Sequence, residues 1–103
     1  MNDAPKPIGA GASAGDIRRT VVIRNKRGLH ARAAARFVKL AWQFDAEVTV
    51  RKNGTTVSGR SIMGLMMLAA GPGTEIELAA TGLDAERAVA ALADLVTGGF
   101  DEG

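Results

Sequence analysis

The sequence predicts an α+β fold, a two-layer open-faced β-sandwich whose elements follow the order β-α-β-β-α-β-α. Four short segments alternate apolar and polar residues as strands do, and two longer segments carry apolar residues at helical spacing. With 103 residues, of which 47% are hydrophobic, the chain can build one core. Four half-buried strands need cover on one face, and the two long amphipathic helices supply it.

The first strand is predicted over residues 18–25, where β-branched side chains cluster, and the first helix over residues 31–44. The helical stripe consists of Ala34, Phe37, Val38, Ala41 and Phe44. Trp42 lies beside this stripe and is expected to be half-buried. Residues 1–17 are rich in Gly, Ala and Pro, so they are predicted to form a disordered extension before a domain at residues 18–98 and a short tail at residues 99–103.

A β-hairpin is predicted around Asn53-Gly54, the dipeptide most typical of a two-residue type I′ turn. Val48 and Val50 alternate with polar residues in the strand before it. A two-residue turn pairs Val50 with Val57, which places two β-branched apolar side chains opposite each other on one face.

A short helix is predicted over residues 61–68, with Ser61 as its N-cap. Three of its residues are methionine, and Gly64 lies among them. Two interpretations stay open. Either the methionines form an adaptable surface for partner proteins, or Leu65 and Leu68 face the core and the methionines fill gaps.

A fourth strand and a last helix complete the predicted fold. Ile76, Leu78 and Ala80 alternate with glutamates, and Asp84 is predicted to cap the helix that follows. The apolar stripe of that helix is Ala85, Ala88, Val89, Leu92 and Val96, and Gly98-Gly99 ends it. The turn at residues 71–73 shows no phosphate-loop pattern.

The strongest candidate for function is His30, the only histidine, which lies in residues 27–37 where strand pattern changes to helix pattern. A helix N-terminus offers unpaired backbone N–H groups and a positive dipole, so a phosphate on this imidazole would be held by backbone. Arg32 adds a cation two residues further on. The alternative from the residues alone is that His30 is a surface or capping residue.

Composition excludes several classes of site. The absence of cysteine excludes disulfides, thiolate zinc sites and a cysteine nucleophile, and a single histidine makes a metal site unexpected. The longest apolar run, residues 62–70, is too short to cross a bilayer, and the first residues lack a signal-peptide pattern. We therefore expect a cytoplasmic protein with no membrane insertion.

The charge is strongly asymmetric, since ten of the 13 Lys and Arg residues lie between positions 18 and 52, around His30. This half is suited to an anionic ligand or an acidic partner surface. A small nucleic-acid-binding module is a second interpretation of the same charge. The chain lacks an aromatic stacking platform and a Gly-x-x-Gly clamp in a basic turn, so no nucleic-acid partner is expected.

Two motifs together resemble a known family. Gly28-Leu29-His30-Ala31-Arg32, followed 31 residues after the histidine by Ser61-Ile62-Met63-Gly64-Leu65-Met66, resembles HPr, the histidine-containing phosphocarrier of the bacterial phosphotransferase system. The resemblance covers residues 18–98. It implies an antiparallel sheet of order 1-4-2-3, a monomer, and no cofactor.

The resemblance also implies roles for individual residues. His30 would accept a phosphoryl group on Nδ1 from phospho-enzyme I and pass it to a IIA-type protein, as a carrier rather than a turnover enzyme. Arg32 would steady the phosphate. Ser61 would be phosphorylated from ATP by a bifunctional HPr kinase/phosphorylase. The residues that would dock partner proteins are Ile62, Met63, Met66 and Lys39.

One residue departs from the family pattern, because most members carry proline where this chain has Ala33. Proline would pre-set the backbone in the first helical turn, so alanine loosens the helix start. The sequence leaves open whether the chain serves sugar uptake or the regulatory, nitrogen-type branch. A regulatory module that controls partner proteins is the alternative function.

Overall fold

The computed structural model describes residues 16–102, so all but the last two residues of the extension predicted at 1–17 lie outside the described residues. Ile17, which was predicted to belong to that extension, is the first residue of the first strand. The elements follow the predicted order, with a short 3-10 turn, η1, added after the last helix. They are β1 (Ile17–Val22), α1 (Ala31–Ala41), β2 (Glu47–Lys52), β3 (Thr55–Ser58), α2 (Ile62–Met67), β4 (Glu75–Thr81), α3 (Ala85–Thr97) and η1 (Gly99–Asp101).

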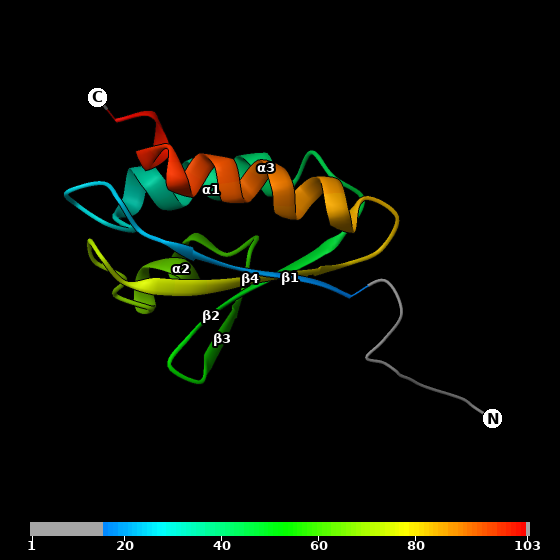
Figure 1. Ribbon diagram of the computed structural model, residues 1–103, viewed down its shortest axis with the longest axis horizontal. Helices are drawn as coiled ribbons and strands as arrows, with labels where there is room; N and C mark the ends of the chain where they lie inside the picture. Colours follow the sequence, from blue (N-terminus) through cyan, green and yellow to red (C-terminus); the bar gives the residue numbers. More distant parts are fainter. Residues whose placement is uncertain (1–15, 103) are drawn as a thin grey trace.

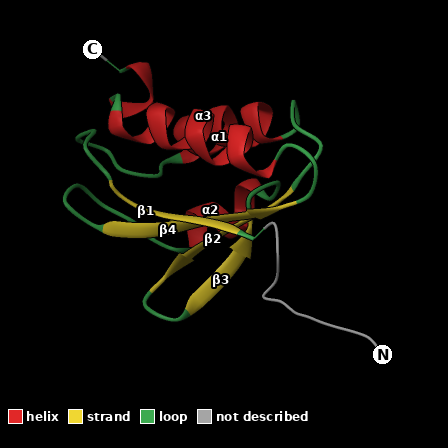
Figure 2. Ribbon diagram, turned by 45° about the vertical axis from the view of Figure 1, so that its right-hand side comes forward, coloured by secondary structure: helices red, strands yellow, loops and turns green. Residues whose placement is uncertain are grey.

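The four strands form one antiparallel sheet in the order β1-β4-β2-β3. The two long helices, α1 and α3, lie side by side over one face of this sheet (Figures 1 and 2), and the shorter α2 packs against α1 and β3. The predicted two-layer fold and the strand order that the resemblance implied are both confirmed.

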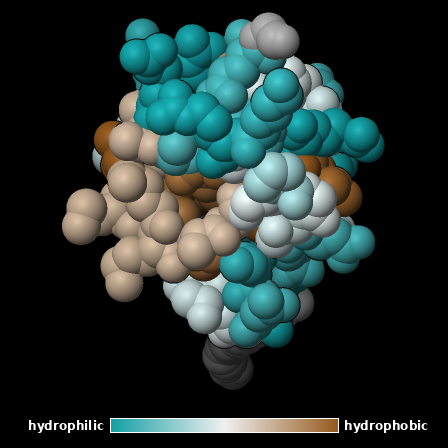
Figure 3. Space-filling view, turned by 90° about the vertical axis from the view of Figure 1, so that its left-hand side faces the viewer, coloured by the Kyte–Doolittle hydropathy of each residue, from teal (hydrophilic) through white to brown (hydrophobic). Residues whose placement is uncertain are grey.

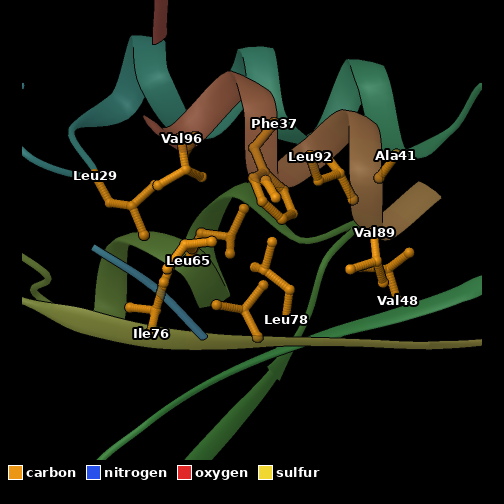
Figure 4. Packing of buried hydrophobic residues seen from close by; sticks show 14 of the residues in the cluster. Leu29, Phe37, Ala41, Val48, Leu65, Ile76, Leu78, Val89, Leu92 and Val96 are labelled. Atoms are coloured by element: carbon orange, nitrogen blue, oxygen red, sulfur yellow. The ribbon is translucent and has the colours of Figure 1, made fainter. Parts of the chain in front are cut away.

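The core lies between the sheet and the long helices, as Figure 4 shows. Period-2 alternation points the apolar side chains of β2 and β4 at the helices, and Phe37 fills the space between them with no exposed surface. Burying one such large side chain stabilises the fold by about 1.5–3 kcal/mol. The sheet residues at this interface are Val48, Val50, Ile76 and Leu78, and the helix residues include Phe37, Ala41, Val89, Leu92 and Val96.

The hairpin between β2 and β3 forms as predicted. Asn53 and Gly54 both have positive φ, 48° and 83°, which a type I′ turn requires. Val50 is paired with Val57. The local turn residues therefore set the strand register correctly.

Two element boundaries differ from the prediction. β1 ends at Val22 rather than at residue 25, because Ile23 pairs instead with the turn before β4, donating to the Thr74 carbonyl oxygen at 2.9 Å. α1 ends at Ala41 rather than at residue 44. Beyond Ala41, the backbone N–H groups of Gln43 and Phe44 donate to the residue three positions earlier instead of four, so the α-helical pattern stops. Trp42 lies at this end and is 62% exposed rather than half-buried, with the Arg60 guanidinium 4.2 Å from its ring centroid.

The start of α3 has the predicted residue but another hydrogen-bond pattern. Asp84 occupies the N-cap position, yet its carboxylate accepts no hydrogen bond from a backbone N–H of the first turn. One carboxylate oxygen accepts from the Asp45 backbone N–H at 2.8 Å, and the other accepts from the Arg87 side chain at 3.2 Å. The bond from Asp45 links the loop after α1 to the loop before α3.

The residues after α3 pack back onto the domain. Gly98 ends α3 as predicted, and Gly99 turns the chain with a φ of 71°. Phe100 is then completely buried in the core. The predicted tail at 99–103 is thus attached to the fold as far as Glu102, while the domain boundary at 98 stays a prediction.

Candidate functional site

His30 is the N-cap residue of α1, as the sequence predicted. Its backbone is extended, with φ −73° and ψ 175°, and its carbonyl oxygen accepts the first helical hydrogen bond from Ala34 at 2.8 Å. Its side chain makes no cap hydrogen bond to the first turn. The N–H groups of residues 31–33 therefore remain available to an anion at this helix end.

The turn before His30 packs directly on the segment that follows α2. Gly28 has a φ of 64°, and a Cβ at this position would lie 2.3 Å from the Ala70 carbonyl oxygen. Leu29 donates to the same carbonyl at 3.0 Å and is buried. Glycine is required here both for the left-handed backbone and for the close approach. The loop that carries His30 is thus held against the end of α2.

Arg32 lies at the same end of α1 as His30, whereas Lys39 lies at the other end. Arg32 is exposed in the first turn of α1. Lys39 lies in the last turn, nine residues after His30 and so about 13 Å from it along the helix axis at 1.5 Å per residue. There it borders a surface hollow shared with Leu95 of α3. Lys39 is therefore not part of the immediate surroundings of His30.

The Met-rich helix α2 has one buried face and one exposed face. Leu65 and Leu68 are buried, whereas Met63 and Met67 are 71% and 78% exposed. The methionines thus do not fill core gaps. Ile62 and Met66, at 39% and 41%, extend the same surface, and Figure 3 shows hydrophobic and hydrophilic side chains side by side at this end of the molecule.

Ser61 caps α2 as predicted, because its hydroxyl oxygen accepts from the Gly64 backbone N–H at 2.9 Å. The other end of the helix is held by Lys52, whose Nζ donates to the Leu68 carbonyl oxygen at 2.9 Å. It is this second end that adjoins the His30 loop through Ala70. Ser61 therefore lies at the N-terminal end of α2, whereas the His30 loop contacts the segment that follows its C-terminal end.

Glu102, which was not among the site residues predicted from the sequence, contacts His30 directly. One carboxylate oxygen, Oε2, lies against His30 Nε2, and the other, Oε1, accepts from Asn25 Nδ2 at 3.1 Å. The hydrogen bond to His30 is the main cause that lowers the pKa of Glu102 below its ordinary value of 4.5, with help from Asn25 and the charge of Arg27. Only 14% of the His30 side chain stays exposed.

The one local signal for this contact was Phe100, a large aromatic residue in a segment taken to be a tail. Its burial fixes the chain two residues before Glu102. Within residues 16–102 no group of three or more His, Cys, Asp or Glu side chains is arranged to hold a metal ion. None of the described helices is long and apolar enough to cross a membrane.

Comparisons with known proteins agree with these features. The family model described as the PTS HPr component phosphorylation site matches residues 17–98. The chain is 53% identical over 87 residues to the phosphocarrier protein HPr of Neisseria meningitidis serogroup A, covering 84% of this chain and 98% of that protein. It is 45% identical over 86 residues to the phosphocarrier protein NPr of Shewanella violacea, covering 84% and 94%. Its fold is similar to that of HPr-C-His from Thermoanaerobacter tengcongensis, with a TM-score of 0.81, 42% identity, and coverage of 84% and 98%.

Proposed function

The chain belongs to the HPr family of phosphocarrier proteins, and from this premise we propose that it accepts a phosphoryl group on His30 and passes it on. The donor is phospho-enzyme I, charged by phosphoenolpyruvate, and the acceptor is a IIA-type protein. The protein acts as a monomeric carrier in the cytoplasm, without a cofactor.

The observation that carries this proposal is the position of His30 at the N-cap of α1 with its side chain free of the cap. In the transfer step the Nδ1 lone pair attacks phosphorus, and the bond from phosphorus to the donor breaks with its electron pair. Nδ1 then carries a phosphoryl group beside the first-turn N–H groups and the Arg32 guanidinium. The reverse bond changes deliver the group to the acceptor.

The strength of this anion site suits a carrier. An exposed helix N-terminus stabilises an anion by about 0.3–1 kcal/mol, which aids phosphorylation without trapping the product. Because this stabilisation is small, the phosphoryl group can leave almost as readily as it arrives. Ala33, in place of the usual proline, retains a backbone N–H in the first turn that proline would lack.

The docking surface in this proposal is the exposed face of α2, formed by Ile62, Met63 and Met66. Thioether side chains adapt to differently shaped partners, which a carrier with a separate donor and acceptor needs. The basic half of the chain complements acidic partner surfaces. Lys39, which lies in the last turn of α1 and apart from α2, is assigned to the docking surface as a separate electrostatic contact.

Ser61 is the proposed regulatory site, phosphorylated from ATP by an HPr kinase/phosphorylase. A phosphate adds about −1.5 to −2 charges, and the N-terminal end of α2 tolerates them. The new charge would stand next to the docking surface and repel acidic partners. The helix would persist while the charging of His30 slows.

The decisive experiment incubates the protein with phosphoenolpyruvate and enzyme I and measures acid-labile phosphate. We expect labelling of the wild-type chain and none of His30→Ala. The matched control is Arg51→Ala, an exposed residue on the uncovered face of the sheet, which should label normally. A wild-type chain that takes up no phosphate, under conditions in which a known HPr is labelled, would contradict the proposal.

The alternative is a regulatory module whose phosphorylation state controls partner proteins, as in a nitrogen-type branch. The exposed methionine surface favours it, since binding alone needs that surface. Purified phosphorylated protein can be offered to a sugar-specific IIA protein and to a nitrogen-type IIA protein. Faster transfer to the first indicates sugar uptake, and faster transfer to the second indicates the regulatory branch.

A further inference from the structure

The C-terminal segment after α3 is firmly anchored before it reaches His30. Gly99, Phe100 and Asp101 have successive φ values of 71°, 57° and 61°. Positive φ is uncommon outside glycine and persists only where the surroundings hold it. Here the Phe100 side chain is fully buried and its carbonyl oxygen accepts from Arg36 Nη1 at 2.7 Å. The turn therefore delivers Glu102 to a defined place.

The Glu102 carboxylate is oriented by Asn25 as well as by the histidine. Asn25 Nδ2 donates both to the Gly28 carbonyl oxygen at 2.8 Å and to Glu102 Oε1 at 3.1 Å. Both neighbours are acceptors, so the amide nitrogen must face them. Asn25 is only 6% exposed, and its Oδ1 has no partner among the described residues. An apolar residue would avoid that cost, so the double donation is the function of this amide.

The charges around Glu102 favour its ionised form. The carboxylate lines a hollow with Arg24, Lys26 and Arg27, on the loop between β1 and α1. Figure 1 shows this loop and the C-terminal segment at the same end of the molecule. The pKa of Glu102 is lowered by its bond to His30, by Asn25 and by the charge of Arg27. At neutral pH the group is a hydrogen-bond acceptor only.

An acceptor fixed on Nε2 decides which tautomer the neutral imidazole adopts. Nε2 must carry the proton that Glu102 accepts, so Nδ1 keeps the lone pair. We propose, on the basis of the proposed carrier function, that Glu102 is a positioning residue, which holds the His30 ring by Nε2–H and presents Nδ1 as the phosphoryl acceptor.

The same contact assists both transfer steps. When Nδ1 attacks phosphorus and the donor leaves with its electron pair, the ring becomes positively charged while Nε2 keeps its proton. The Glu102 carboxylate stabilises that charge on the side away from the phosphoryl group. When the acceptor attacks, the P–N electron pair returns to Nδ1 and the neutral Nε2–H tautomer is restored. No proton needs to enter or leave.

The test compares Glu102→Ala and Glu102→Gln with the control Asp101→Asn. Asp101 is the neighbouring acid, 77% exposed, and its 3.8 Å pair with Arg36 contributes little. Long-range ¹H–¹⁵N NMR of His30 should show the Nε2–H tautomer in the wild type and in Asp101→Asn, and a mixture in Glu102→Ala. Enzyme I should charge Glu102→Ala about tenfold or more slowly, as the loss of a carboxylate behind a functional histidine typically costs. Glu102→Gln should lie between, because its amide oxygen still accepts.

The outcomes separate this inference from the proposed function. A wild-type chain that is never phosphorylated defeats the carrier function, whereas the tautomer measurement still tests the role of Glu102. An unchanged tautomer and an unchanged charging rate in Glu102→Ala overturn the positioning role. So does an equal slowing in Asp101→Asn, which would indicate a general effect of charge. Thermal unfolding of each variant checks that the fold is retained.

Discussion

At the scale of single residues, the site depends on one close approach of two backbones. Gly28 packs against Ala70: a Cβ on Gly28 would be strained by the positive φ and would also lie 2.3 Å from the Ala70 carbonyl oxygen. Gly54 offers a matched comparison, because it also has positive φ but nothing lies within 4 Å of its missing Cβ. The two glycines therefore separate conformational strain from steric clash.

We expect Gly54→Ala to destabilise the fold by about 1–2 kcal/mol, the cost of a left-handed alanine. Gly28→Ala should cost above about 3 kcal/mol, since the clash with the Ala70 carbonyl adds to that strain. Urea unfolding of the two variants measures the difference. Equal losses in both would show that the loop can move away from α2 without penalty.

The Glu102 contact predicts a transition at acid pH. The pKa of Glu102 is lower in the folded chain than its ordinary value of 4.5. A depressed carboxyl pKa stabilises the attached segment above pH 4.5, and that contribution is lost as the pH falls through the folded value. The groups that face this carboxylate are His30, Asn25 and Arg27.

An NMR titration should therefore show the Asn25 side-chain amide changing shift below pH 4.5 together with the Glu102 carboxyl. Glu102→Gln removes the titrating group and should abolish the change at Asn25. A wild-type midpoint at or above 4.5 would contradict the contact.

At the scale of elements, the six residues of α2 combine a buried face with the proposed docking surface, and Ser61 caps them. The N-cap of this helix can accept a negative charge without loss of the helix, because aspartate caps about as well as serine. The helix therefore separates the effect of charge on docking from its effect on folding.

Ser61→Asp should slow the charging of His30 by about fivefold, which corresponds to a repulsion of about 1 kcal/mol between the new charge and an acidic partner. Steady-state charging by enzyme I measures the effect. Thr56→Asp on β3 adds the same charge at an exposed residue that alternates with Val57, on the face of the sheet opposite α2, and should have little effect. Ser61→Ala reports the loss of the cap alone, about 1 kcal/mol of stability. Unchanged charging of Ser61→Asp would refute the regulatory role.

At the scale of the whole molecule, features that depend on residues close in sequence could be predicted from the sequence better than features that depend on long-range contacts. The Asn53-Gly54 turn and the Ser61 cap involve neighbours in sequence, so their residue types determine their geometry. Strand order is not encoded in that way, and only the resemblance supplied it. The backbone N–H that bonds to the Asp84 carboxylate likewise belongs to a residue 39 positions away rather than to the first turn of α3.

In the candidate site, too, the residues placed by local pattern were predicted and the residue placed by a long-range contact was not. His30 is the N-cap of α1 and Arg32 lies in its first turn, so the change from strand to helix pattern predicted their positions at the helix start. Glu102 is 72 residues from His30 and reaches it through a backbone turn and a buried phenylalanine, none of which follows from hydrophobic spacing. The expected burial of Trp42 was wrong because α1 ends one residue before it, so the helical spacing used to place its side chain does not apply.

The distribution of charge over the molecule leads to the last prediction. Ten of 13 Lys and Arg residues lie between positions 18 and 52, but the fold spreads them over two faces. Lys39 lies in the last turn of α1, whereas Arg51 alternates with the buried Val50 and so lies on the uncovered face of the sheet. If partners approach at the helical face, only the charges there will steer them.

Charging of His30 by enzyme I should therefore slow as NaCl rises from about 0.05 M to about 0.5 M, because the Debye length shortens. Lys39→Glu should slow it about fivefold at low salt through a lower association rate, and this defect should shrink at high salt. Arg51→Glu makes the same change in net charge and should alter the rate by less than about twofold. Equal effects of the two variants would mean that net charge steers the encounter, and Lys39 would then have no place in the docking surface. A defect confined to Lys39→Glu would extend that surface from α2 along the whole length of α1.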